Sequence, residues 1–191
     1  MKPADALEEL ARFGRERPED AARVARFRAL LEETRAPLSR AQFAPGHLTC
    51  SACVLADGGA RVLLLHHAKL GRWLQPGGHV DADDPSPLAG ALREVREESG
   101  LAELTPLAGA AGSALVDVDV HEIPARAGEP AHLHYDLRFA VAAREAAPLR
   151  RSGESNALRW VEAGRLAEWT DEESVTRLVA RARVRAREAV P

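Results

Sequence analysis

The most informative stretch of this sequence is Arg93-Glu94-Val95-Arg96-Glu97-Glu98-Ser99-Gly100-Leu101. It follows a glycine-rich turn, Gln75-Pro76-Gly77-Gly78-His79, and a short run of helix-forming residues. Gly100 is typical of the residue that ends a helix. A helix over residues 88–99 would have one apolar stripe facing a core. That stripe consists of Leu88, Ala91, Leu92 and Val95.

The opposite side of this predicted helix is acidic. Glu94, Glu97 and Glu98 are spaced i, i+3, i+4, so they would project from one face. Three like charges on one turn repel each other and would destabilise the helix unaided. A divalent cation reverses that effect, because hard Mg²⁺ takes carboxylate oxygens and shares them with water and phosphate oxygens. The structural alternative is a solvated acidic face, with Arg93 pairing to Glu97 at i, i+4.

Residues Gly77 to Leu101 resemble the Nudix box. That motif runs glycine, five residues, glutamate, seven residues, then Arg-Glu-aliphatic-any-Glu-Glu-any-Gly-aliphatic. The segment from Arg93 to Leu101 matches every defined position of its second half. The first half departs, because the span from Gly78 to Arg93 is one residue longer and lacks the expected glutamate. Asp84, or Asp83, is the nearest carboxylate.

The resemblance implies an α/β fold of the Nudix type, an α/β/α sandwich whose acidic helix packs beside a mixed β-sheet. Residues 45–191 would form this domain, and residues 1–44 an N-terminal helical extension. Gly71 to Gly78 and Arg159-Trp160-Val161 also look like segments of family members.

The resemblance further implies a Mg²⁺-dependent pyrophosphohydrolase, with Mn²⁺ as a substitute ion. The substrate would be a small molecule, a nucleoside diphosphate linked to another moiety, such as a nucleotide sugar or an ADP-ribose-like compound. Water would attack phosphorus, and clustered glutamates holding Mg²⁺ can neutralise the phosphoryl oxygens and activate that water.

Individual roles follow from the match to the box. Glu97 and Glu98 match direct metal ligands, and Glu94 matches either a ligand or the base that orients water. The backbone carbonyl of Gly77 matches a further ligand. Arg93 matches a residue that holds carboxylates in place, and an exposed pair with Glu97 is its alternative role.

Several residues outside the box are further candidates. Glu154, six residues before Trp160, could supply one more metal-binding acid, or be a solvated loop glutamate. Lys69 and Arg72 precede the glycine turn and could meet phosphate oxygens. A predicted strand carries polar residues on one face, which could be a substrate wall, a second metal site or simply a polar or interfacial face. These residues are His132, His134, Asp136 and Arg138, of which His134 and Arg138 are candidate substrate contacts.

The composition is that of an ordinary globular protein and disfavours some functional classes. Of the 191 residues, 46% are hydrophobic and 29% charged, which is ordinary for a globular protein. The net charge of −3 argues against a dedicated nucleic-acid binder. The arginine-rich stretch 177–187 predicts a solvated helix face. Because no signal peptide or membrane-length apolar stretch is evident, we expect a cytoplasmic protein with no membrane partner.

The two cysteines, Cys50 and Cys53, have C-x-x-C spacing, which invites a redox or zinc interpretation. A zinc site needs four ligands and no second cysteine pair exists. Residues 48–55 also read as a strand, where an offset of three places the two side chains on opposite faces. We expect reduced, structural thiols.

The remaining pattern predicts the other elements. Two helices are expected within residues 3 to about 35, the first ending at Gly14 and the second starting near Pro18. They could form a lid, a packing cap or a dimer arm, so a homodimer is open. Strands are expected at 48–55, 61–65, 114–123, 133–141 and 158–161, with Val116, Val118 and Val120 on one face. Thr170 and Glu173 suggest a capping box for a last helix.

One alternative from another functional class fits the same residues. A module on this scaffold could bind a nucleotide ligand as a sensor without cleaving it. The intact set of Glu94, Glu97 and Glu98 favours the enzyme, because a sensor could lose one of them.

Overall fold

The computed structural model describes residues 1–126, 128–153 and 155–189. Over these residues the chain forms a mixed eight-stranded sheet between helices. The strands are β1 (Gly46–Ala56), β2 (Arg61–His67), β3 (Trp73–Leu74), β4 (Gly77–His79), β5 (Thr105–Pro106), β6 (Leu115–Ile123), β7 (His132–Ala142) and β8 (Ser155–Glu162). The helices are α1 (Pro3–Glu16), α2 (Ala21–Glu33), α3 (Pro87–Ser99) and α4 (Glu173–Glu188), with short 3₁₀ turns η1 (Pro18–Asp20), η2 (Asp57–Gly59) and η3 (Ala163–Glu168).

The central strand is β1, which is buried along its whole length. It pairs in parallel with β7 along one edge and antiparallel with β4 and β2 along the other. Beyond β7 lies β6, and beyond β2 lie β3 and β8. β4 therefore joins β1 next to the segment that leads into α3, and it positions the glycine turn beside that helix.

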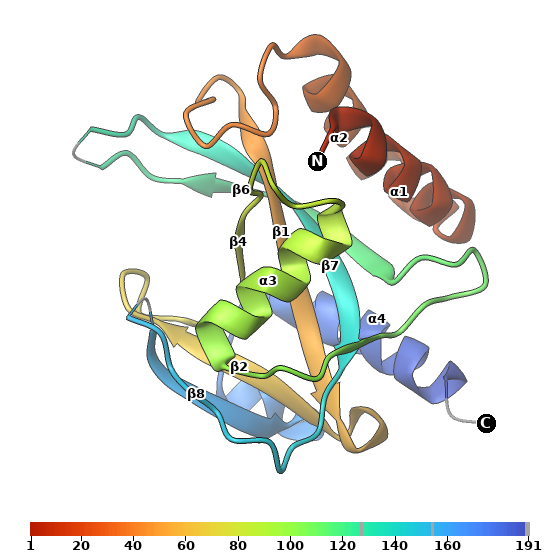
Figure 1. Cartoon of the computed structure of the whole chain (residues 1–191), viewed down its shortest axis with the longest axis vertical. Coiled ribbons are helices and arrows are strands. Elements are labelled where there is room, and N and C mark those ends of the chain that lie inside the picture. The colour runs from red at the N-terminus through yellow and green to blue at the C-terminus, as the bar shows by residue number, and fades with distance from the viewer. Residues whose placement is uncertain (127, 154, 190–191) are drawn as a thin grey trace.

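Helices cover both faces of the sheet (Figure 1). α1, α2 and α3 pack on one face, in a hydrophobic core that they share with β1, β6 and β7. α4 and η3 pack on the other face, in a second hydrophobic core that they share with residues of β1, β2, β6, β7 and β8. The predicted α/β/α sandwich with N-terminal helices is thus confirmed.

The two cysteines lie on opposite faces of β1, as predicted. Cys50 belongs to the core under α1, α2 and α3, and Cys53 to the core under α4. Both are buried free thiols. Burial raises the pKa of Cys53 to about 12, so this sulfur is a poor nucleophile.

The expected single face of Val116, Val118 and Val120 is wrong. The pairing of β6 with β7 passes from Leu115 opposite Phe139 to Asp117 opposite Arg138, so Val116 is an extra residue in a β-bulge. Val118 and Val120 pack in the core under α1, α2 and α3, whereas Val116 packs in the core under α4. Simple alternation could not reveal this change of face.

The N-terminal helices pack on the sheet, in the hydrophobic core under α3. α1 continues past Gly14 to Glu16, and α2 begins only after η1, so both predicted boundaries shift. Phe13 and Phe27 are fully buried in the core shared with the sheet. The boundary between residues 44 and 45 stays a prediction.

Except for Arg187, which is exposed, the arginines of α4 are not the solvated face that the sequence predicted. Arg177 and Arg181 pair with Asp117 at 3.0 and 2.7 Å, and Arg181 also pairs with Asp20 at 2.8 Å. Arg185 pairs with Glu16 of α1 at 2.6 Å. These ion pairs join α4 to β6 and to the N-terminal helices.

The start of α4 also differs from the prediction. The helix begins at Glu173 with Glu172 as its N-cap and no side-chain cap, so Thr170 and Glu173 do not form a capping box. Thr170 instead accepts a hydrogen bond from the backbone N–H of Glu172, at 3.3 Å. No helix within the described residues is long and apolar enough to cross a membrane.

Candidate functional site

The acidic helix α3 has well-formed ends. Its N-cap, Ser86, accepts a hydrogen bond from the N–H of Ala89 at 3.2 Å, and Pro87 follows at the first helical position. Gly100 takes the left-handed conformation, with φ 74°, and donates to the carbonyl of Arg96. The helix predicted over residues 88–99 is confirmed.

Two glycines of β4 receive the glutamates of α3. The N–H of Gly77 donates to Glu98 Oε2 at 2.9 Å. A Cβ on Gly78 would lie 2.7 Å from all three carboxylate atoms of Glu94, so only glycine leaves room for this group. The glycine turn and α3 therefore fit each other, and Glu94 and Glu98 both lie against β4.

The three glutamates differ in burial, although the sequence placed them on one exposed face. Glu98 is only 5% exposed, whereas the side chain of Glu97 is 58% exposed. Glu98 follows Ala91 and Val95 at helical spacing, and all three are buried. The acidic and apolar faces thus meet at Glu98, which points toward the sheet instead of solvent.

Arg93 lies at the centre of the acidic groups. Its Nη1 donates to Glu94 at 2.9 Å and to Glu97 at 3.3 Å. Its Nη2 donates to the carbonyl oxygen of His79 in β4, at 2.8 Å. Arg93 therefore holds two carboxylates of α3 and also ties α3 to β4.

Asp84, the nearest carboxylate to the position where the box has its first glutamate, pairs with Arg93. Arg93 donates to it twice, from Nε to Oδ1 and from Nη2 to Oδ2, both at 3.0 Å. Asp84 also accepts from the N–H of Asp81 at 2.7 Å and lies against Gly90, where a Cβ would come within 2.9 Å of its Oδ2. Asp83 is exposed.

The pKa values of this pair shift as expected for a strong ion pair. Burial alone would raise the pKa of Asp84, but the hydrogen bonds and charge of Arg93 outweigh it, and the pKa falls below its usual value. The hydrogen bond to Asp84 is the largest contribution that raises the pKa of Arg93. Both groups are therefore charged at neutral pH.

The described residues contain one group of three side chains whose ligand atoms all lie within 4.8 Å of one another. It consists of His47, His132 and His134, not of the glutamates of α3. Glu94 and Glu98 lie against β4, while Glu97 lies on the exposed side of Arg93.

The predicted substrate residues are not gathered in one place. Arg72 pairs with Glu172, which precedes α4, and Lys69 is exposed in the loop after β2. Arg138 is 2% exposed and donates to Asp136 and Asp119, at 2.9 and 3.0 Å. Its donors are thus used inside the protein. Glu154, the predicted additional metal ligand, lies outside the described residues.

His134 belongs to a cluster of histidines that the sequence only partly indicated. Burial lowers its pKa to about 2, and the neighbouring histidines add to the shift. His47 and His79, from β1 and β4, contact its ring, with centroids 4.7 and 5.2 Å away. The spacing of His132 and His134 indicated one strand of this cluster, but no sequence pattern predicts that β1 and β4 lie beside it.

Comparison with known proteins identifies the family. The family model described as NUDIX domain matches residues 45–181. A NUDIX-family hydrolase from Clostridium perfringens is similar in structure, with 24% identity and a TM-score of 0.53, over 73% of this chain and 95% of that one. A binary complex of the Ap4A hydrolase of C. elegans is similar with 17% identity and a TM-score of 0.52, over 70% of this chain and 93% of that one.

These structural similarities, at low identity, show a shared fold. No curated protein matches the chain in sequence. The match of the family model covers most of the chain and includes α3, β4 and the whole box. The chain therefore belongs to the Nudix family, and its assignment as a hydrolase acting on pyrophosphate bonds follows from that membership.

Proposed function

We propose that this Nudix hydrolase is a Mg²⁺-dependent pyrophosphohydrolase that cleaves the diphosphate linkage of a nucleoside diphosphate joined to another moiety. Nucleotide sugars and ADP-ribose-like compounds are the substrate class, and Mn²⁺ can substitute for Mg²⁺. The observation that supports this most is the fit of Glu94 and Glu98 to the two glycines of β4. We further propose a cytoplasmic location and no nucleic-acid or membrane partner.

The residues present fit a hard divalent cation. The donor set consists of carboxylates and a backbone carbonyl, which are the oxygen ligands that Mg²⁺ prefers. Gly78 lacks the Cβ that would fill the space taken by the Glu94 carboxylate, so this acid can lie against the backbone of β4. Glu98, Glu97, Glu94 and the carbonyl of Gly77 would hold the ion, with Glu154 as the proposed additional acid.

Bound Mg²⁺ supplies charge neutralisation at the phosphoryl oxygens and a water of lowered pKa. The side chains then divide the remaining work. Glu98, held by the N–H of Gly77, has a fixed orientation and is suited to be a ligand. Glu97 is exposed and can turn toward the substrate. Glu94 serves either as a ligand or as the base that takes the proton of the attacking water.

Arg93 acts as a positioning residue in this scheme. Arg93 forms ion pairs with Glu94, Glu97 and Asp84. These contacts keep the two glutamate carboxylates at a fixed separation. Lys69 and Arg72 remain proposed contacts for phosphate oxygens. His134 and Arg138 remain proposed substrate contacts, although Arg138 would first have to exchange an internal partner.

The N-terminal helices contribute to the core of one chain, and this use favours a packing cap over a lid. We also propose that the chain forms a homodimer. Light scattering, which measures the oligomeric state in solution, tests this proposal.

A substrate panel tests the proposed function. The purified chain is incubated with Mg²⁺ and nucleotide sugars, ADP-ribose, dinucleoside polyphosphates and nucleoside triphosphates, and phosphorus NMR follows the products. We expect cleavage of at least one nucleoside diphosphate compound, with heavy oxygen from labelled water appearing on a phosphate product. A sensor would instead bind one of these compounds, as calorimetry can show, with no turnover. That result would overturn the proposal.

A further inference from the structure

A belt of histidines crosses one face of the sheet. Five of the seven histidines of the chain lie on four adjacent strands, in the order β4, β1, β7 and β6. They are His79, His47, His132 with His134, and His121. His47 pairs with His134 across the parallel strands, and His121 pairs with His134 on its other side. Strand pairing thus brings together residues that are far apart in sequence.

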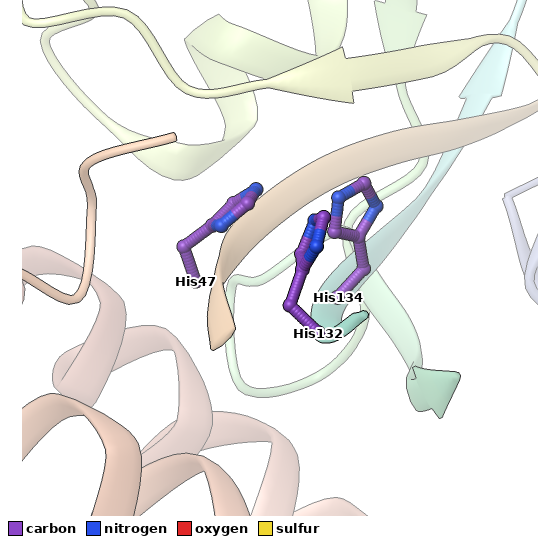
Figure 2. A group of neighbouring side chains, drawn as sticks. All are labelled: His47, His132 and His134. Carbon is purple, nitrogen blue, oxygen red and sulfur yellow. The ribbon is translucent and has the colours of Figure 1, made fainter. Parts of the chain in front are cut away.

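Three of these side chains converge at the start of β1 and β7. Figure 2 shows the rings of His47, His132 and His134 side by side at this end of the sheet. One ring nitrogen from each lies within 4.8 Å of the others. The ring centroids are 4.7 to 5.2 Å apart, so a modest rotation of the rings would bring three nitrogens to one point.

In two of the rings, a hydrogen bond shows which ring nitrogen has a lone pair available for a metal ion. His47 Nδ1 lies 3.0 Å from the carbonyl oxygen of Gln42, and His132 Nδ1 lies 2.8 Å from that of Pro130. A carbonyl oxygen only accepts, so each Nδ1 carries the proton and each Nε2 presents a lone pair. Backbone carbonyls orient metal-binding histidines in this way.

His47 Nε2 has no hydrogen-bond partner, although His47 is only 1% exposed. A buried nitrogen with an unused lone pair is costly unless something binds it. A ring nitrogen of His47 also lies within 4.8 Å of nitrogens of two other imidazoles, and such a set suits a soft or borderline cation.

We propose that His47, His132 and His134 bind a Zn²⁺ ion, at a second metal site on the side of the sheet away from α3. Imidazole nitrogens suit Zn²⁺ and its neighbours among the transition metals, whereas Mg²⁺ prefers the oxygen ligands of α3. Three ring nitrogens leave one of the four tetrahedral positions of Zn²⁺ for water or another ligand. The ring of His79, 5.0 Å from that of His47 and 5.2 Å from that of His134, is one candidate for it.

A bound Zn²⁺ ion would cross-link β1 and β7 at the point where both strands begin. The loop that contains Gln42 and the loop that contains Pro130 would be fixed as well, because their carbonyls orient two of the ligands. This inference does not depend on the proposed hydrolysis, since it concerns other residues and another class of ion.

Zinc titration of the full, tag-free chain tests the site. Measurements are made with excess Mg²⁺ present, in a variant carrying both Glu97→Gln and Glu98→Gln, so that zinc binding by the acids of α3 is weakened and outcompeted. Competition with a chromogenic chelator should give one Zn²⁺ per chain. Zinc should raise the melting temperature by about 5 to 10 °C at roughly a hundred times its dissociation constant. X-ray absorption at the zinc edge should show imidazole nitrogens at about 2.0–2.1 Å.

Ligand variants give the matched comparison. His132→Gln should weaken zinc binding by at least about a hundredfold, since it removes one of three protein ligands. His66→Gln, on β2 and outside the cluster, should bind zinc as the parent does. Zinc bound equally well by His132→Gln, an oxygen-only coordination shell, or no binding at micromolar zinc would each overturn the proposal. The absorption spectrum needs no histidine variant, so a poorly folded variant does not hide the outcome.

Discussion

Arg93 and Asp84 form a paired contact in which Nε meets Oδ1 and Nη2 meets Oδ2, each at 3.0 Å. Two parallel bonds between a guanidinium and a carboxylate fix the plane of both groups. The same guanidinium donates to Glu94 and Glu97, so the orientation of Asp84 is passed on to the predicted metal ligands.

Replacing Asp84 should destabilise the protein and reduce its activity. Asp84→Asn keeps the shape of the side chain but removes the charge that Arg93 requires, and we expect a loss of about 2–3 kcal/mol in the free energy of unfolding. Unfolding by urea measures this change in the free energy of unfolding. Asp83→Asn, at an exposed neighbouring position, should change the same quantity by less than about 0.5 kcal/mol. Equal effects at both positions would contradict the assignment of Asp84.

The buried and the exposed glutamates should both be needed for hydrolysis. Glu98→Gln and Glu97→Gln should each lower kcat/KM by a hundredfold or more, which corresponds to about 3 kcal/mol of barrier. Glu32→Gln, an exposed glutamate on α2, is the matched control and should retain full activity. Turnover unchanged in both active-site variants would place the chemistry elsewhere.

Gly78 should tolerate no side chain if the position of Glu94 matters. In Gly78→Ala the new methyl group would overlap the Glu94 carboxylate and displace it, so we expect at least a tenfold loss of kcat. Gly164→Ala adds the same group where no atom lies within 4 Å, and its activity should match that of the parent. Steady-state kinetics on both variants, with circular dichroism as a check of folding, separates the two results.

Acid should weaken the contact between the N-terminal helices and α4. Burial raises the pKa of Asp20, but the hydrogen bonds and charges of Arg181 and Arg23 outweigh it, so the pKa lies below 3.8 in the folded protein. A lowered pKa contributes stability that is complete above 3.8 and is lost as the pH falls through the folded value. The free energy of unfolding should therefore fall as the pH drops below about 4.

Asp20→Asn tests this contribution, because asparagine does not titrate there. The variant should be less stable than the parent at neutral pH and should lose less stability on acidification. Urea titrations across this pH range compare the two slopes. Parallel curves for parent and variant would show that Asp20 does not contribute to the acid sensitivity.

The sequence predicted the local elements well. The helix over 88–99 has strong local signals, because the proline and glycine at its ends and its apolar spacing all agree. The alternating strands at 48–55 and 133–141 were also found, with boundaries within two residues. Their parallel pairing could not be predicted from periodicity, since it depends on packing between distant segments.

The parts of the site that escaped prediction depend on long-range contacts. The sequence did not show which residue pairs with Asp84, because the loop before α3 is longer than in the motif. The role of Arg138 could not be read either, because its partner Asp119 lies on another strand. Likewise, the convergence of His47 with His134 follows from the register of β1 against β7, which no local pattern encodes.

The ion pairs of Glu16 with Arg185 and of Asp20 with Arg181 connect the first helices to the last one. The segment that matches the family, residues 45–181, excludes Glu16, Asp20 and Arg185. Trimmed to that segment, the polypeptide would expose the apolar surface that Phe13 and Phe27 cover and leave Arg181 without one of its acids. We therefore expect the smallest stably folding fragment to be larger than the segment that matches the family model.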